Sequence, residues 1–382
     1  MDFDFSDFTS TASKREEPER KQEIARPGFS RTSDIDAELE ELLSKKKACI
    51  KVVGVGGAGN NSILRMSDVG IKGAELIAAN TDAQDLLTVI ADKKILLGKE
   101  ITSGLGAGAD PSKGEEAAKE SATLLKKAIE GADMVFITCG LGGGTGTGAA
   151  PVIAEIAKKH GSLTVGVVTL PFSMEGNQRY NNAVKGLNRL QDVVDTLIVI
   201  PNDKLLEIAP DLPMQTAFKV ADEILTNAVK GIAELVTKPG LINLDFADIK
   251  AVMSDGGVAM IGVGESDTEH RAIEAVEKAI TNPLLDVEIT GATGAMINVT
   301  GGENMTLEEA RQVVRAVSER LDPEAKIIWG ASVSKDLQDT IRAMLIVTGV
   351  KSTQIFGGNK TYTSQKIQSI EDELGIKFLK TY

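Results

Sequence analysis

The chain has 382 residues, of which 42% are hydrophobic and 25% charged, and its formal net charge is −13. This balance is typical of a folded protein of about two domains, and the acidic charge argues against nonspecific binding to nucleic acid or to anionic membranes. No apolar run reaches the roughly 18 residues of a membrane-spanning helix, and the acidic start MDFDFSDF lacks the basic residues of a signal peptide. We therefore expect a cytoplasmic protein without direct membrane insertion.

The chain contains too few histidines and cysteines for most chemistry that depends on these residues. It contains 2 cysteines and 2 histidines, which argues against a disulfide framework, a histidine-based triad or a metal cluster. Glycine, in contrast, occurs 38 times. The places where these glycines occur carry most of the functional signal.

Residues 1–47 are predicted to form a disordered tail followed by a short helix. The segment is polar as far as about residue 31, and apolar residues then recur at helical spacing after Ser33. Phenylalanines at positions 3, 5 and 8 fit either a flexible end or a short partner-binding peptide.

Short β-branched runs alternate with helix-length stretches from Cys49 onward. The runs cover residues 49–55, 74–79, 93–97, 133–139, 163–170 and 196–200. Continuous apolar strands separated by helices predict a parallel sheet that is covered on both faces. We therefore expect an α/β fold of the doubly wound parallel-sheet class, with a first domain over residues 48–213.

A long helix and a smaller domain are predicted next. One apolar stripe between Pro213 and Pro239 predicts a central helix over residues 214–238, roughly 35 Å long. Four strand-like runs with helices near 268–281 and 306–321 then predict a smaller four-stranded α/β domain over residues 239–350, packed on that helix. Residues 351–382 are predicted to be a polar C-terminal tail.

Three glycine-rich loops follow predicted strands. Gly54–Asn61 contains a GxGxxG motif between a strand and a helix, Gly142–Gly148 follows the strand at 133–139, and Gly104–Gly108 follows the third strand. Glycines let backbone N–H groups and helix N-termini approach a phosphate closely. Because the carboxyl ends of parallel strands share one edge of the sheet, we expect the loops to converge on one crevice.

These loops suit several kinds of protein. The GxGxxG motif is typical of nicotinamide-dependent oxidoreductases, but the second strand ends at Asn80-Thr81 instead of the acid that would hold the ribose. A tight turn that only packs helix on sheet is another interpretation of that loop. The Gly142–Gly148 loop favours a triphosphate, because its free amides and two threonine hydroxyls can surround the charge. No GxxxxGK[ST] motif occurs, which excludes a Walker-type NTPase.

The Gly142–Gly148 loop resembles the signature of the tubulin/FtsZ superfamily, and six further motifs resemble FtsZ specifically. These are KVVGVGGAGNN (51–61), NTDAQ (80–84), GLGAGADP (104–111), PFSMEG (171–176), PNDKLL (201–206) and NLDFAD (243–248). The resemblance covers about residues 48–350, and the short C-terminal extension is closer to archaeal than to bacterial members. It implies a GTP-binding domain at 48–213 and an activation and assembly domain at 239–350.

By this resemblance, one set of residues binds GTP. Its members are Gly57, Ala58, Gly59, Asn60, Asn61, Gly108, Gly143, Gly144, Thr145, Gly146, Thr147, Glu175, Arg179, Asn202, Phe218 and Asp222. The glycine loops would hold the phosphates together with Mg²⁺, which prefers phosphate and water oxygens as ligands. Glu175 and Arg179 would lie near the ribose; from the sequence alone they are a surface ion pair at i,i+4 spacing.

The residues implied at the base also have a chemical rationale. A carboxylate at Asp222 can accept both N1–H and the exocyclic amine of guanine, whereas adenine offers an unprotonated N1. Phe218, one helical turn earlier, would stack on the purine, although a core position on the apolar stripe is the other interpretation.

Three residues after the long helix are implied in catalysis: Asp245, Asp248 and Asn243. In FtsZ-like filaments, this segment enters the nucleotide pocket of the neighbouring subunit, where its acids position the attacking water. From the sequence alone, Asp245 is a helix N-cap and Asp248 an acid that complements the helix dipole.

The resemblance implies a GTP-hydrolysing, self-assembling cytoskeletal protein whose head-to-tail filaments form the cell-division ring, with hydrolysis between adjacent subunits. It would act in the cytoplasm at mid-cell, without nucleic acid. Division-ring and membrane-tethering proteins are expected partners, and residues 374–380 in the tail are a candidate docking peptide. A tubulin-like regulatory GTP-binding protein that forms no division ring is the alternative.

Overall fold

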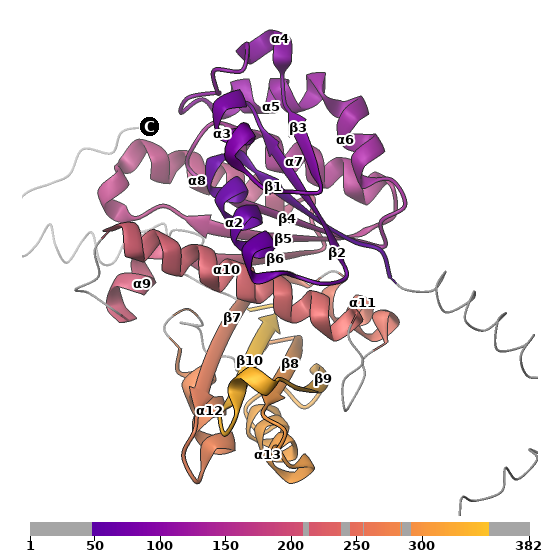
Figure 1. The fold of residues 1–382 in the computed structure, drawn as a ribbon, viewed down its shortest axis with the longest axis vertical. Helices are drawn as coiled ribbons and strands as arrows, with labels where there is room; N and C mark the ends of the chain where they lie inside the picture. Colours follow the sequence, from indigo (N-terminus) through magenta and orange to yellow (C-terminus); the bar gives the residue numbers. More distant parts are fainter. Residues whose placement is uncertain are drawn as a thin grey trace, which may run out of the picture. The chain divides into compact units, whose positions relative to one another are not determined.

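Ten strands form one continuous sheet in the computed structural model, in the order β3-β2-β1-β4-β5-β6-β7-β10-β8-β9 (Figure 1). The structure describes residues 48–208, 214–237, 245–254, 256–282, 284 and 292–350. The strands are β1 (Ile50–Val55), β2 (Ala74–Asn80), β3 (Lys93–Leu96), β4 (Met134–Gly140), β5 (Leu163–Leu170), β6 (Thr196–Pro201), β7 (Gly257–Ser266), β8 (Gly294–Gly301), β9 (Lys326–Val333) and β10 (Ile341–Thr348). β10 runs antiparallel to both of its neighbours, and the other pairs are parallel.

Helices cover both faces of this sheet. One face carries α5 (Pro111–Glu120), α6 (Ala122–Ile129), α7 (Thr145–Lys159), α8 (Asn177–Gln191), α12 (Arg271–Ile280) and α13 (Leu307–Ser318). The other carries α2 (Gly56–Val69), α3 (Ala83–Thr88), α9 (Asn202–Ile208), α10 (Met214–Thr237) and α11 (Phe246–Met253). A one-turn helix, α4 (Lys99–Thr102), follows β3. No described helix is both long enough and apolar enough to span a bilayer.

The predicted doubly wound α/β class is confirmed. Every strand-like run in the sequence overlaps an observed strand, and β3-β2-β1-β4-β5-β6 is the strand order of dinucleotide-binding folds. The chain reverses direction of travel across the sheet between β1 and β4. In such sheets, this point leaves a crevice at the carboxyl ends of the strands, where ligands bind.

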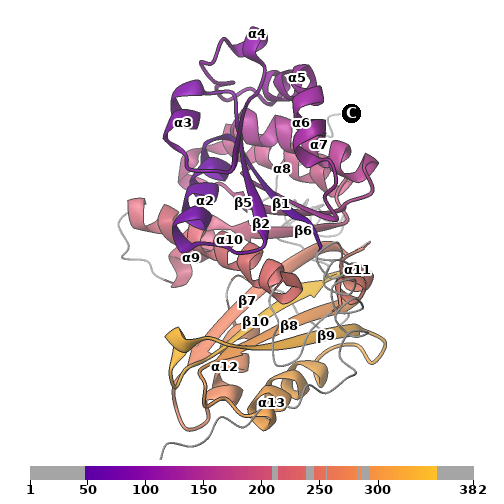
Figure 2. The same ribbon diagram turned by 45° about the vertical axis from the view of Figure 1, so that its right-hand side comes forward.

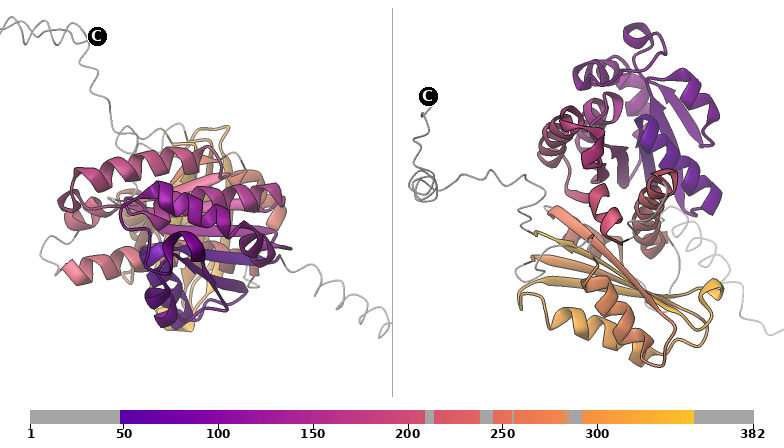
Figure 3. Two further views of the ribbon diagram at one scale, coloured as in Figure 1. Left: turned by 90° about the horizontal axis from the view of Figure 1, so that it is seen from above. Right: turned by 90° about the vertical axis from the view of Figure 1, so that its left-hand side faces the viewer.

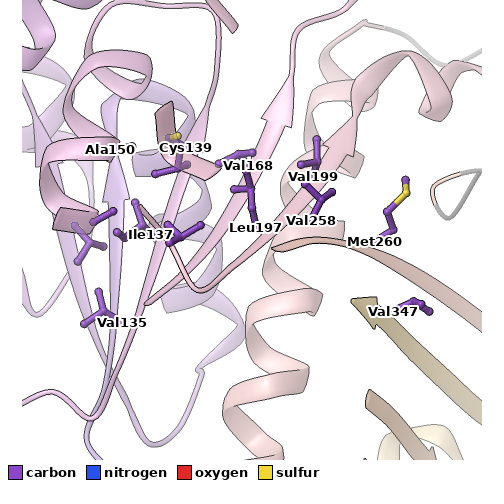
Figure 4. Packing of buried hydrophobic residues seen from close by; sticks show 14 of the residues in the cluster. Val135, Ile137, Cys139, Ala150, Val168, Leu197, Val199, Val258, Met260 and Val347 are labelled. Carbon is purple, nitrogen blue, oxygen red and sulfur yellow. The ribbon is translucent and has the colours of Figure 1, made fainter. Parts of the chain in front are cut away.

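The C-terminal strands continue the first sheet, which the sequence did not indicate. Thr196–Ile198 of β6 pairs with 257–259 of β7, and one buried apolar cluster extends across this junction. Figure 4 shows that cluster from Val135 and Ile137 on β4 to Val258 and Met260 on β7.

The predicted central helix is observed as α10 over the described residues 214–237, and the residues on either side of it lie outside the described part of the chain. α10 buries Ala221, Ala228 and Ile232, three members of the predicted stripe. Figures 2 and 3 show α10 between the strands β1–β6 and the strands of the C-terminal region, with α12 and α13 on the far side of the latter. At Gly231 an added Cβ would lie 2.6 Å from Sδ of Met344 on β10, so α10 and β10 pack closely at this point and a larger residue would displace the methionine side chain.

Some features had no clear signal in the sequence. The stretch after Pro111 looks like one helix, yet it breaks at Ser121, whose hydroxyl accepts a hydrogen bond from the Gly98 amide at 2.9 Å. The predicted terminal tails, 1–47 and 351–382, lie outside the described residues.

Candidate functional site

The turn from β1 into α2 is built for close packing. An added Cβ at Gly54 would lie 2.4 Å from the Gly59 carbonyl oxygen, and one at Gly59 would lie 2.5 Å from that of Thr138. Gly56 has a φ of +71°, a left-handed conformation that glycine adopts without strain. These contacts bring the N-terminus of α2 to the carboxyl ends of β1 and β4.

The loop between β4 and α7 is equally constrained. Gly142 has a φ of +108°, and its amide donates a 2.8 Å hydrogen bond to Thr147 Oγ1. An added Cβ at Gly146 would lie 2.7 Å from the Gly140 carbonyl oxygen, whereas one at Gly143 would meet nothing within 4 Å. Gly142 and Gly146 are therefore needed for the conformation and packing of the loop, whereas Gly143 faces open space.

The third glycine loop reaches the same place by a detour. β2 separates β3 from β1, so the strands that precede the three loops are not all neighbours in the sheet. α4 and three glycines with positive φ turn the chain back, and the Gly144 amide donates to the Gly108 carbonyl at 3.0 Å. The predicted convergence of the three loops is thus observed.

These loops line a pocket of about 310 Å³ at the switch between β1 and β4. Twelve of the predicted nucleotide residues line it: Gly57, Ala58, Gly108, Gly143, Gly144, Thr145, Gly146, Glu175, Arg179, Asn202, Phe218 and Asp222. Helices α2 and α7 both begin at this pocket, and the free N–H groups of their first turns favour binding of an anion. Arg179 is the single cationic side chain among the described lining residues, so backbone dipoles must supply most of the attraction for a phosphate.

The other predicted nucleotide residues lie outside the lining. Gly59 packs on β4; Asn60 is fully buried and donates to Asp85 Oδ2 at 3.2 Å. Thr147 holds the phosphate loop through the Gly142 amide, and Asn61 is exposed on α2. The structure gives Gly59, Asn60 and Thr147 supporting roles around the pocket.

Sequence analysis missed some lining residues. Gly56, Thr169 and Ala221 line the pocket as well. Gly56 belongs to the GxGxxG motif and could have been found there. Thr169 comes from β5 and Ala221 from α10, and only the sheet order and the helix direction place them here.

The end of the pocket formed by α10 has the features of a purine site. Phe218 is 40% exposed, and its ring is nearly perpendicular to that of Phe172, with centroids 5.1 Å apart. A partly exposed aromatic ring in the lining is available for stacking with a base. One turn later, Asp222 lies beside Ser62 Oγ at 3.3 Å. Burial raises the pKa of the Asp222 carboxyl to about 6, against the opposing effects of Ser62 and Arg65.

Glu175 and Arg179 form the ion pair that their spacing predicts. Arg179 Nη1 lies 2.6 Å from Glu175 Oε2, and Glu175 Oε1 accepts from the Phe172 amide at 2.9 Å. The pair lies at the rim, with the Arg179 side chain 54% exposed. Through Glu175, which pairs with Arg179 and also accepts from the Phe172 amide, the start of α8 is connected to the segment that carries Phe172.

The two acids implied in catalysis start α11, at the end of α10 away from α9 (Figure 1). Asp245 is the N-cap and accepts a hydrogen bond from the Ala247 amide, while Asp248 lies in the first turn. Both are exposed, as their local interpretation predicts, and neither lines the pocket of its own chain. Asn243 lies outside the described residues.

Comparison with known proteins agrees with this geometry. Residues 49–210 match the model of the Tubulin/FtsZ family, GTPase domain, and residues 257–351 match that of the FtsZ family, C-terminal domain. The chain is 60% identical over 358 residues to "Cell division protein FtsZ 1" of Pyrococcus abyssi, covering 94% of each protein. It is 64% identical over 317 residues to the protein of that name from Methanocaldococcus jannaschii, covering 83% of this chain and 87% of the relative.

Solved structures give the same answer. An empty FtsZ dimer from M. jannaschii has a TM-score of 0.80 at 64% identity, covering 82% of this chain and 92% of that one. The GDP-bound CetZ1 monomer from Haloferax volcanii, at 22% identity and a TM-score of 0.71, shares the fold; that match covers 85% of this chain and 99% of the other.

The doubly wound sheet, the three glycine loops and the central helix thus define a GTPase domain of the tubulin type. The matches to both domains and the high identity are more specific. The chain belongs to the FtsZ family. An oxidoreductase interpretation of the GxGxxG motif is therefore wrong, and Asn80, at the end of β2, donates to Asp85.

Proposed function

We propose that this chain is a cell-division GTPase that assembles head to tail into filaments and hydrolyses GTP between neighbouring subunits. The observation that carries the proposal is the separation of two functions along α10. The pocket lies at one end of the helix and the exposed acids start at the other. Asp222 in the pocket lies 15 residues before Thr237, the last residue of α10, so about 22 Å of helix separates the pocket from the end next to α11, too far for these carboxylates to reach their own pocket.

The pocket supports GTP as the ligand. Amides of the glycine loops and two helix N-termini face the position where the phosphates would lie, and Phe218 offers a ring face to the base. Ionised Asp222 would accept from N1–H and the amine of guanine. Adenine would present an unprotonated N1 to this buried acceptor, so we expect the pocket to prefer guanine.

Mg²⁺ would enter with the nucleotide. Among the described residues, no three His, Cys, Asp or Glu side chains come together as a metal site. The nearby Asp85 carboxylate is already engaged by Asn60 and Asn80. The ion would therefore be held chiefly by phosphate oxygens and water, as this hard cation prefers, and would neutralise phosphate charge.

The acids would then act in the pocket of the next subunit. Asp245 and Asp248 are exposed and lie three residues apart, so both project from one helix start. A carboxylate there could orient the attacking water, the step that positioning and electrostatics accelerate in phosphoryl transfer. Asn243, two residues before Asp245, is proposed to assist them.

A mixing experiment tests the shared site. Asp248→Asn keeps the pocket and loses one acid, whereas Thr145→Arg blocks the phosphate loop and keeps both acids. Each variant alone should hydrolyse GTP slowly, and their mixture should regain activity, because some interfaces pair a sound pocket with a sound acidic turn. Wild-type activity per molecule should also fall on dilution. Full turnover by Asp248→Asn, or activity independent of concentration, would contradict the proposal.

Assembly and location form a second part of the proposal. We infer that filaments form at the division site in the cytoplasm and that ring or membrane-tethering proteins bind the chain, with the C-terminal tail as a candidate docking segment. Light scattering after addition of GTP, GDP or ATP separates a filament former from a regulatory GTP-binding protein. A rise with GTP alone supports assembly, and no rise at any concentration contradicts it.

A further inference from the structure

Ser62 contacts two walls of the pocket without lining it. Its side chain is fully buried on α2. Oγ lies 3.3 Å from Asp222 Oδ1 on α10 and 3.1 Å from the carbonyl oxygen of Ala58, one turn earlier on α2. Ala58 and Asp222 both line the pocket. Ser62 thus connects the first turn of α2 with the acid that faces the base.

The chemistry of one hydroxyl makes this connection depend on the charge of Asp222. The hydroxyl has one proton and donates it to one acceptor at a time. When Asp222 is ionised, it is the stronger acceptor, and the Ser62 O–H turns to it. When Asp222 is protonated, its own O–H donates to Ser62 Oγ, and Ser62 donates to Ala58. Buried polar groups are paired in both states, but only the ionised one accepts from guanine.

Few other charges act on this carboxyl. The nearest charged side chains on the elements around it are Arg65 on α2, Lys219 and Glu223 on α10, Asp203 and Lys204 on α9, and Glu175 and Arg179 across the pocket. Asp68 on α2 and Lys230 and Glu234 on α10 lie further along their helices. Arg65 is the one among them that lowers the pKa of Asp222, and it also pairs with Glu223 at 3.3 Å. Ser62 is therefore the main uncharged group that favours the ionised form.

We propose that Ser62 is a positioning residue for guanine recognition, whose hydroxyl orients the Asp222 carboxylate and keeps it ionised near neutral pH. The inference rests on the proposed role of Asp222 in reading guanine. It concerns nucleotide binding to a single chain, so it can be tested without assembly or hydrolysis.

The test measures binding of fluorescent GDP at pH 6 and pH 8, with dilute wild-type, Ser62→Ala, Ser62→Thr and Ser67→Ala full-length chains. Ser62→Ala should weaken binding about 10-fold at pH 6 and no more than about 3-fold at pH 8, because the carboxyl then keeps its proton to higher pH. For each variant we define the pH ratio as the Kd of GDP at pH 6 divided by its Kd at pH 8. The nucleotide phosphate titrates near pH 6 as well, so the pH ratio of each variant is compared with that of wild type.

The controls separate positioning from packing. Ser62→Thr restores the hydroxyl and should restore the wild-type ratio, and Ser67→Ala removes a hydroxyl on the same helix that does not contact Asp222. In an Asp222→Asn background, Ser62→Ala should leave the ratio unchanged, since no carboxyl titrates. Equal weakening at both pH values would overturn the inference.

A further comparison distinguishes the two proposals. If Asp222→Asn still prefers GDP over ADP as wild type does, the proposed role of Asp222 fails. If that preference is lost while Ser62→Ala keeps the wild-type pH ratio, only the inference about Ser62 fails.

Discussion

The nucleotide pocket and the acidic start of α11 are built in opposite ways. The pocket is formed mainly by backbone, and at two of its lining glycines, Gly144 and Gly146, an added Cβ would collide with carbonyl oxygens of neighbouring segments. Asp245 and Asp248 are exposed side chains on the first turn of an eight-residue helix. In the described structure, Asp245 bonds only within its own turn.

Under the proposed function, this difference separates nucleotide binding from hydrolysis. A pocket that is fixed by close backbone packing forms completely when one chain folds, so it can bind a phosphate without a partner subunit. Exposed carboxylates in water have little influence on a distant charge, because solvent and salt screen them. In the proposed mechanism, they become effective only when a second copy brings them against the nucleotide and excludes water.

The largest expected effect comes from separating the two roles of Asp245. Asp245→Asn keeps a good N-cap and removes the charge, whereas Asp245→Ala also loses the cap, at a cost of about 1 kcal/mol in stability. If the carboxylate serves the neighbouring pocket, both should hydrolyse GTP about 100-fold more slowly, with GTP binding intact. Steady-state phosphate release and denaturation measure the two effects. Wild-type turnover by Asp245→Asn would show that Asp245 acts only as a helix N-cap and takes no part in hydrolysis.

Two glycines of the phosphate loop should respond differently. Gly146→Ala forces a Cβ to 2.7 Å from a carbonyl oxygen, so we expect a loss of about 1–3 kcal/mol in stability and weaker GTP binding. Gly143→Ala meets no protein atom and should keep its stability, yet it should bind GTP more weakly because phosphate oxygens would occupy that space. Thermal unfolding and GTP titration distinguish the two. Wild-type affinity in Gly143→Ala would show that the phosphates lie elsewhere.

The nucleotide-free protein should be stabilised by Asp222→Asn at high pH. Because burial raises the folded-state pKa of this acid to about 6, the ionised form costs stability above pH 6, and that cost disappears as pH falls toward the ordinary value. We expect a gain of about 1–3 kcal/mol at pH 8 and little below pH 4, together with a weakened preference for GTP over ATP. Urea unfolding of Asp222→Asn and wild type at the two pH values measures this gain in the free energy of unfolding. An equal gain at both pH values would contradict the prediction.

The smallest effect is expected at the rim. Arg179→Gln breaks an exposed i,i+4 ion pair, so stability should change by only a few tenths of a kcal/mol. Any larger effect should appear as weaker nucleotide binding, because Arg179 is the cation of the pocket lining. Unfolding and GTP titration, repeated in high salt, separate these contributions. A loss of more than about 1 kcal/mol in stability would show a structural role for the pair.

The sequence by itself determined the doubly wound fold, the central helix α10 and the loops that form the pocket. These features depend on local physics: β-branched runs favour strands, an apolar stripe defines a buried helix face, and glycine marks close backbone approaches. It also indicated the N-cap role of Asp245. Assignment of the base and ribose residues needed the family resemblance, because Phe218 and Asp222 alone look like ordinary helix positions.

Only the tertiary structure decided how distant segments meet. The β6–β7 pairing that joins both halves into one sheet depends on backbone hydrogen bonds between strands about 60 residues apart, which leave no local pattern. The return of the Gly104–Gly108 loop past β2 rests on positive φ angles and on one carbonyl bonded to Gly144. The contact of Ser62 with Asp222 joins residues 160 positions apart, because α2 and α10 pack against each other on one face of the sheet.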